Sequence, residues 1–294
     1  MGETTSLGIQ NMKIIIAGLA KSGTSALAFR LKNTLSHNTI FLHEPSRYTL
    51  SREEPSRPVL AKALLYNAPN EVDYESFGCF DKKILIVRDP RDRLVSSILY
   101  QVVGSFWEDN RKVTKFIDLL KRKESAPDTV SVLMFARLLE KYRWHYFWKK
   151  SLSSPKPGKI RKRLESVNFW KSSMYGGHLS LAMEFHSKHR DYFVIKYEDF
   201  ISGKTEGLEE YLGFRLLNDV IHDRKLDMVA RTKKSGGWKN WFLDEDIAFF
   251  RPRFLDFMKR YRYADEWRVN RFPKISPKHC SEYVRKIVEI RRAD

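Results

Sequence analysis

The chain has 294 residues, of which 42% are hydrophobic and 31% are charged. This balance is typical of a globular protein and excludes a disordered or fibrous one. Lys and Arg outnumber Asp and Glu by 54 to 36, which gives a formal net charge of +18. Such an excess indicates an anionic partner and leaves three classes open: nucleic acid, an anionic membrane or a polyanionic small ligand.

The cysteines and the apolar runs indicate the cellular location of the chain. Cys79 and Cys280 lie far apart, and neither a disulfide framework nor a metal-ligand spacing surrounds them. We therefore expect a reducing, cytoplasmic location and no metal site. The apolar run at residues 14–20 is too short to span a bilayer, so we expect no stable membrane insertion.

Strand-like and helix-like segments alternate along the chain, which predicts an α/β fold with a mostly parallel sheet flanked by helices. We predict a single domain over residues 1–294, with residues 1–11 flexible, residues 151–158 a loop, and Pro252 starting or interrupting its helix. The predicted strands are 13–18, 39–43, 59–65, 83–87 and 192–197; the predicted helices are 24–35, one from Pro90 onward, 130–150, 174–188, 206–212, 246–261 and 281–292.

In parallel sheets of this kind, ligands bind beyond the carboxyl ends of the strands. The loop after the first strand reads Lys21, Ser22, Gly23, Thr24, Ser25. A turn into a helix amino terminus favours an anion, because its N–H groups are unpaired and the helix dipole is positive there. A P-loop NTPase needs its lysine directly after the second glycine, whereas here Thr24 holds that place. An ATPase or GTPase is therefore disfavoured, and an ordinary strand–helix turn stays an alternative.

The same run resembles the 5′-phosphosulfate loop of sulfotransferases that use 3′-phosphoadenosine-5′-phosphosulfate (PAPS). Arg88 ends a strand and Ser96 follows eight residues later, which resembles the family's 3′-phosphate segment. Residues 231–240, a basic run that ends in Trp-Lys-Asn, and the Tyr-Glu-Asp run from Tyr197 are similar to two later segments of the family. The resemblance covers most of the chain and implies the sulfotransferase fold, PAPS as co-substrate and adenosine 3′,5′-bisphosphate (PAP) as product.

The resemblance also implies roles for individual residues. Lys21 neutralises the leaving phosphate, the loop N–H groups hold the 5′ end, and Tyr197 lies near the adenine. The 3′-phosphate is held by the side chains of Arg88, Ser96 and Arg231 and by the N–H groups of Thr232 and Lys233. The chain departs from the cytosolic drug-metabolising branch at Ala26, where that branch carries a tryptophan.

The catalytic base is assigned through a further likeness. Residues 41–45 resemble the Glu-Pro segment of bacterial and carbohydrate sulfotransferases, which implies Glu44 as base and a chain of that branch. His43 is the alternative, because imidazole titrates near neutrality and neighbouring strand residues point to opposite faces. Lys62 and Lys21 complete the catalytic set. If neither Glu44 nor His43 acts, His145 or His178 is the next candidate.

Two other functions stay open. A nucleotide or small-molecule kinase would need Asp89 or Asp199 as a metal ligand. A nucleic-acid-binding protein is suggested by the net charge and by the basic and aromatic residues between 141 and 150, although no nucleic-acid-binding motif accompanies them.

The acceptor, a hydroxyl or amine of a small molecule or carbohydrate, and the oligomeric state are not specified by the sequence. An aromatic segment is expected either to border the acceptor pocket or to belong to the core; it contains Trp144, His145, Tyr146, Trp148 and Trp170.

Overall fold

The computed structural model describes residues 11–49, 57–65, 72–153, 174–217, 231–232 and 234–293, and the single residues Gly158, Ile160, Leu164 and Asn168. Its contacts divide the chain into two compact units, residues 1–88 with 180–227 and residues 89–179 with 228–294. The described part of the first unit holds the sheet, and that of the second is helical. The single-domain prediction stays a prediction, as does the flexibility of residues 1–11, all but the last of which lie outside the described residues.

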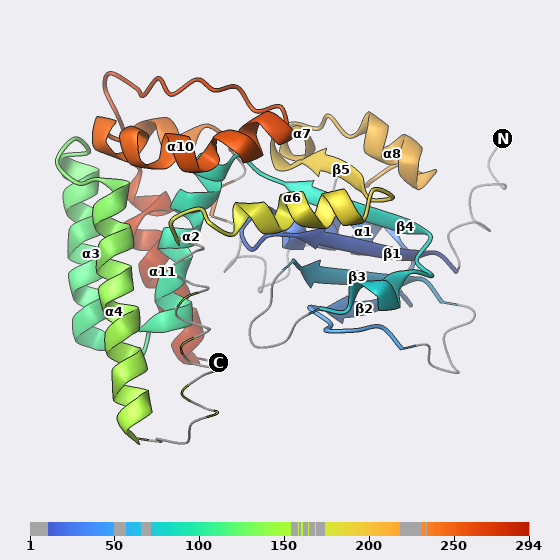
Figure 1. Cartoon of the computed structure of the whole chain (residues 1–294), viewed down its shortest axis with the longest axis horizontal. Helices are drawn as coiled ribbons and strands as arrows, with labels where there is room; N and C mark the ends of the chain where they lie inside the picture. The colour runs from blue at the N-terminus through green and yellow to red at the C-terminus, as the bar shows by residue number, and fades with distance from the viewer. Residues whose placement is uncertain are drawn as a thin grey trace. The chain divides into compact units, whose positions relative to one another are not determined.

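The first unit is built on a five-stranded sheet with the order β2-β3-β1-β4-β5 (Figure 1). Every neighbouring pair is parallel, which confirms the predicted α/β class. Continuous apolar runs suit strands that are buried on both faces, and Ile14, Ile15 and Ile16 are accordingly fully buried. The strands are β1 (Lys13–Gly18), β2 (Ile40–His43), β3 (Val59–Leu64), β4 (Lys82–Val87) and β5 (Phe193–Lys196).

The strand order determines where the loops gather. From β1 the chain first builds β2 and β3 on one side, and after β3 it crosses to β4 and β5 on the other. A reversal of this kind opens a crevice at the carboxyl ends of the strands. Gly18, which ends β1, is in register with Leu64 at the end of β3 and with Ile86 near the end of β4. The segments that follow these three strands therefore leave the same edge of the sheet.

Helices cover the sheet. On one face α1 (Thr24–Thr34), α7 (Tyr197–Ile201) and α8 (Glu206–Leu212) pack against alternate strand residues such as Ile14, Leu60 and Ile84. Leu27 and Leu31, which lie one turn apart on α1, belong to this core. Figure 1 shows α6 (Leu179–Lys188) crossing in front of the strands. The 3-10 turn η1 (Tyr74–Phe77) precedes β4.

The second unit is a helical assembly. α2 packs against α4, α10 and α11, and α11 also packs against α3. Asp89 caps α2 by accepting a hydrogen bond from the Arg91 N–H, and Pro90 is its first residue, as predicted. The helices are α2 (Pro90–Ser105), α3 (Asn110–Ser125), α4 (Val132–Ser153), α10 (Asp244–Arg260) and α11 (Ser281–Ala293), with 3-10 turns η2 (Gly237–Asn240) and η3 (Pro277–His279).

Three sequence predictions about helices were wrong. Residues 151–153, expected in a loop, belong to α4, which continues to Ser153, and Gly158 is also helical; residues 154–157 lie outside the described part. Pro252 neither starts nor interrupts α10, which runs through it; Pro252 is exposed, so water can satisfy the carbonyl that loses its partner. The helix expected from Met174 begins at Leu179, because residues 175–178 form a turn. In the described part of the chain, no helix combines the length and the apolar character needed to cross a bilayer.

Candidate functional site

The loop between β1 and α1 has the backbone of an anion site. Lys21 and Gly23 adopt left-handed conformations, with φ of 67° and 98°, and the Ser22 N–H donates to the Leu19 carbonyl at 3.1 Å. Gly23 occupies the cap position of α1, where it brings no side-chain acceptor, and the first turn contains no acidic residue. The amino terminus of α1 therefore keeps the positive end of its dipole uncompensated by its own residues.

Arg88 brings a buried cation to this loop. It follows β4 directly and is 6% exposed. Its Nη1 donates to the Lys21 carbonyl at 3.1 Å. Its Nε is buried and has no hydrogen-bond partner among the described residues, and no carboxylate of the described residues pairs with it. A buried charge without a counter-ion is costly, so this arrangement favours an anion at the loop.

The Tyr197 ring contacts both Arg88 and the loop between β1 and α1. Its ring centroid lies 4.4 Å from the centre of the Arg88 guanidinium. A Cβ added to Gly23 would stand 2.3 Å from Tyr197 Cδ2, so the ring packs directly against the loop backbone. Tyr197 is the first residue of α7 and is buried. It thus holds Arg88 against the loop, and its predicted contact with adenine stays a prediction.

Glu44 and Lys62 form an ion pair at the same edge of the sheet. Lys62 lies on β3 in register with Ile16 of β1 and His43 of β2, and it is 3% exposed. Glu44 follows β2 with a left-handed φ of 53°, and its N–H donates to the Lys62 carbonyl at 2.8 Å. This turn removes Glu44 from the alternation of the strand and lets its carboxylate reach Lys62. The Glu44 side chain stays 26% exposed, and His43 is exposed.

Backbone strain is concentrated at this edge. Among the described residues, the non-glycine positions with positive φ are Lys21, Glu44 and Arg262. Such conformations cost on the order of 1–3 kcal/mol each and cluster at functional sites. Two of the three, Lys21 and Glu44, follow the parallel strands β1 and β2 of the central sheet, which supports the assignment of this edge as the site.

The segments predicted for the 3′-phosphate are divided between the units. Arg88 belongs to the first unit, and Ser96, Arg231 and Thr232 belong to the second. Within the second unit, Asp92 of α2 accepts hydrogen bonds from the N–H groups of Gly236 (2.5 Å) and Trp238 (2.9 Å). The helix that carries the buried Ser96 is therefore tied to the segment after Arg231.

Arg231 and Thr232 each form a hydrogen bond within the second unit. Arg231 Nη1 donates to the His279 carbonyl at 3.1 Å, and Thr232 Oγ1 accepts from the Lys234 N–H at 3.1 Å. Lys233 lies outside the described residues. The pairing of Arg88 with these second-unit groups stays a prediction.

Two arginines at the start of α2 are buried. Arg91 and Arg93 are not solvated: they are 5% and 1% exposed. The Arg91 guanidinium donates to both carboxylate oxygens of Asp89 and lies 4.1 Å from the ring centroid of Trp238 and 5.0 Å from that of Trp267. The tryptophans come from distant parts of the sequence, so local pattern could not reveal this packing. Asp89 is committed to Arg91, which weakens its case as a metal ligand.

The remaining candidates from the sequence, namely the aromatic residues and the alternative bases His145 and His178, do not gather at one site. Trp148 is 59% exposed, His178 is buried, and His145 Nδ1 lies 3.2 Å from Lys112 Nζ on the surface. Trp170 and the side chain of Tyr146 lie outside the described part. Within that part, no three His, Cys, Asp or Glu side chains gather as a metal site would require.

Comparisons with known proteins add little. No model of a protein family matches the chain, and no curated protein matches its sequence. Among solved structures, that of mouse sulfotransferase SULT7A1 complexed with PAP is similar, with 19% sequence identity, a TM-score of 0.47, and coverage of 87% of this chain and 90% of that chain. A likeness at this level supports no conclusion about this chain.

The packing of Tyr197 on Gly23 yields a stability test. Gly23→Ala introduces both an unfavourable left-handed alanine and a clash with a ring that Arg88 holds in place. Gly213→Ala is the matched control, because Gly213 has φ of +84° but no atom within 4 Å of its added Cβ. In urea unfolding we expect Gly213→Ala to cost about 1 kcal/mol and Gly23→Ala about 1–3 kcal/mol more. Equal losses would show that Tyr197 does not pack on the loop.

Proposed function

We propose that the chain is a sulfotransferase that takes its sulfuryl group from PAPS. The observation that carries the proposal is the Arg88 guanidinium, which is buried, bonded to the Lys21 carbonyl and without a counter-ion among the described residues. It stands beside an amino terminus that itself favours an anion. A phosphate would supply the missing acceptor, since guanidinium groups and backbone N–H groups are the usual ligands of phosphate.

The choice of PAPS over a nucleoside triphosphate depends on the loop and on the other segments. The lysine precedes the second glycine of the loop instead of following it, which departs from the P-loop pattern. The four segments that resemble the sulfotransferase family follow one another in the family's order. Lys21 would hold the 5′ leaving phosphate, and Arg88, Ser96 and Arg231 would hold the 3′-phosphate with the N–H groups of Thr232 and Lys233.

The proposed reaction is an in-line displacement at sulfur. The acceptor oxygen or nitrogen forms a bond to sulfur as the bond from sulfur to the 5′-phosphate oxygen breaks, and PAP leaves. Charge grows on the leaving phosphate in the transition state, so catalysis is mainly positioning and charge stabilisation. Lys21 supplies that charge. Glu44 accepts the proton of the acceptor, and Lys62 positions Glu44 through their ion pair.

Under this proposal the acceptor group belongs to a small molecule or a carbohydrate. The proposal also includes a cytoplasmic location and a reaction that needs no metal. The likeness of residues 41–45 to the Glu-Pro segment favours the bacterial or carbohydrate branch. The acid at position 44 would then do the work that a histidine does in the drug-metabolising branch.

Ligand binding tests the donor site and the role of Arg88 together. In EDTA we expect calorimetry to show PAP binding, with PAP bound more tightly than AMP, which lacks the 3′-phosphate. Arg88→Gln should weaken PAP by about tenfold or more and bring its affinity close to that of AMP, because losing a charged hydrogen-bond partner costs about 1.5–3 kcal/mol. If Arg88→Gln weakens PAP and AMP equally, Arg88 serves the 5′ end instead.

Arg30→Gln is the control for that experiment. Arg30 also lies over an aromatic ring, that of Phe200, and donates to a backbone carbonyl, but it belongs to the last turns of α1. Its replacement should leave both affinities unchanged. Binding of ATP that requires Mg²⁺, with no binding of PAP in EDTA, would reject the proposed function.

The base is tested by transfer kinetics with labelled PAPS. Glu44→Gln keeps the shape of the side chain and removes the proton acceptor, so kcat should fall by about 10²-fold or more while the affinity for PAP stays unchanged. His43→Asn, which alters an exposed neighbour, should leave kcat within a few-fold of the wild type. A near wild-type Glu44→Gln beside an inactive His43→Asn would transfer the role to His43.

A further inference from the structure

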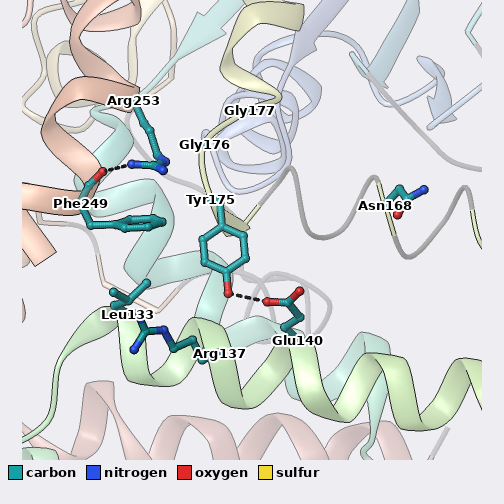
Figure 2. A pocket seen from close by; sticks show the side chains of 9 residues that line it. All are labelled: Leu133, Arg137, Glu140, Asn168, Tyr175, Gly176, Gly177, Phe249 and Arg253. Atoms are coloured by element: carbon teal, nitrogen blue, oxygen red, sulfur yellow. Dashed lines mark hydrogen bonds between the residues drawn. The ribbon is translucent and has the colours of Figure 1, made fainter.

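The second unit contains a cavity of about 700 Å³ whose described lining includes none of the residues assigned above to the donor site or to the base (Figure 2). Cavities of about 300–1,000 Å³ commonly hold small organic ligands. No residue between Trp144 and Trp148 is among the described residues that line it. The described lining comes from α4, from α10, from the turn before α6 and from Asn168, which precedes that turn: Leu133, Arg137, Glu140, Asn168, Tyr175, Gly176, Gly177, Phe249 and Arg253.

Two helices, α4 and α10, contribute walls of the cavity, and one carboxylate joins them. Leu133, Arg137 and Glu140 are spaced along one face of α4. Asp246 of α10 is fully buried and accepts hydrogen bonds from the N–H groups of Val132 (3.0 Å) and Leu133 (2.8 Å) at the start of α4. The walls are therefore fixed relative to each other by buried, charge-assisted hydrogen bonds.

The turn at Tyr175 supplies a third part of the lining. Gly176 has φ of +85°, and a Cβ there would stand 2.6 Å from Phe254 Cε1, so the turn packs tightly on α10. The Tyr175 hydroxyl donates to Glu140 Oε2 at 2.7 Å, as Figure 2 shows. The Tyr175 and Phe249 rings meet edge to face, with centroids 5.8 Å apart. The cavity is thus formed before any ligand enters.

The chemistry of the lining selects an anion with an apolar body. The Arg253 guanidinium centre lies 3.7 Å from the Phe249 ring centroid, and its Nη1 donates to the Phe249 carbonyl at 2.6 Å, which fixes its orientation. Arg137 adds a second cation, and Glu140 is the one carboxylate among the described lining residues. Burial and the bond to Glu140 raise the pKa of Tyr175, so the phenol stays protonated. Leu133, Phe249 and Tyr175 provide apolar surface beside these charges.

We propose that this cavity binds an aromatic carboxylate, whose anionic group is held by Arg253 and Arg137 and whose rings pack against Phe249 and Tyr175. A planar carboxylate matches the guanidinium fork. A single negative charge matches the net charge of the described lining, which carries two arginines and one glutamate. The inference does not depend on sulfuryl transfer.

Naphthoate and its uncharged counterpart naphthalenemethanol are the probes, titrated calorimetrically into the full chain. Naphthoate should bind with a Kd of about 1 mM or below, and naphthalenemethanol at least tenfold more weakly, because one charged contact contributes about tenfold or more. Arg253→Gln should remove most of this difference. Arg251→Gln is the matched control: Arg251 lies on the same helix, is exposed as Arg253 is, pairs with Asp265 and does not line the cavity. It should bind naphthoate like the wild type.

Tyr175→Phe provides a second variant, which keeps the ring and breaks the hydrogen bond to Glu140; it should weaken naphthoate at least threefold. Equal binding of the two probes, equal effects of Arg253→Gln and Arg251→Gln, or no naphthoate binding at 10 mM would each overturn the proposal. The affinity for PAP, measured on the same samples, should not change in Arg253→Gln. Absence of PAP binding in the wild type would count against the proposed transferase alone.

Discussion

The buried guanidinium of Arg88 is the constraint on which the rest of the site depends. β4 delivers it to the carboxyl edge of the sheet, where it donates to the Lys21 carbonyl and lies over the Tyr197 ring. Neither contact neutralises its charge, because one partner is a neutral carbonyl and the other a ring. A folded protein that keeps a buried cation in this state needs an anion nearby. The loop before α1 offers the place for one.

The sheet also explains how Lys21 and Glu44 keep their strained backbone conformations. Glu44 adopts a left-handed backbone directly after β2, and Lys21 does so three residues after the end of β1; both strands are hydrogen-bonded in the sheet. The parallel ladders fix where each chain leaves the sheet, so the strain is held by long-range pairing and not by the loops themselves. In this way Lys62 of β3 and Glu44, which follows β2, come together, and a carboxylate with a buried lysine beside it lies at the edge where the anion is expected.

Much of the fold was predictable because its signals are local. β1 and α8 match their predicted ranges residue for residue: the first is a continuous apolar run closed by glycine, and the second begins with acidic residues and ends before Gly213. α3 was missed, because its apolar residues, Val113, Phe116 and Leu120, are separated by charged ones and were not recognised as a periodic stripe.

The site was predictable in its residue types but not in its geometry. The stack of Tyr197 on Gly23, the left-handed turn at Glu44 and the burial of Arg91 between two tryptophans all depend on contacts between distant segments. The cavity between α4 and α10 has no local signature at all, since Asp246, which holds its walls together, is more than 100 residues from its partners.

The central claim is that the loop before α1 and the end of β4 bind the donor nucleotide without a metal. Amide hydrogen exchange, with and without PAP and always in EDTA, measures this directly. The account predicts slower exchange on PAP addition at residues 19–27 and at residue 88, with no change at the amides of α3, which lies outside the proposed site. Unchanged exchange at residues 19–27 under saturating PAP, or protection that appears with Mg²⁺ and ATP in place of PAP, would contradict it.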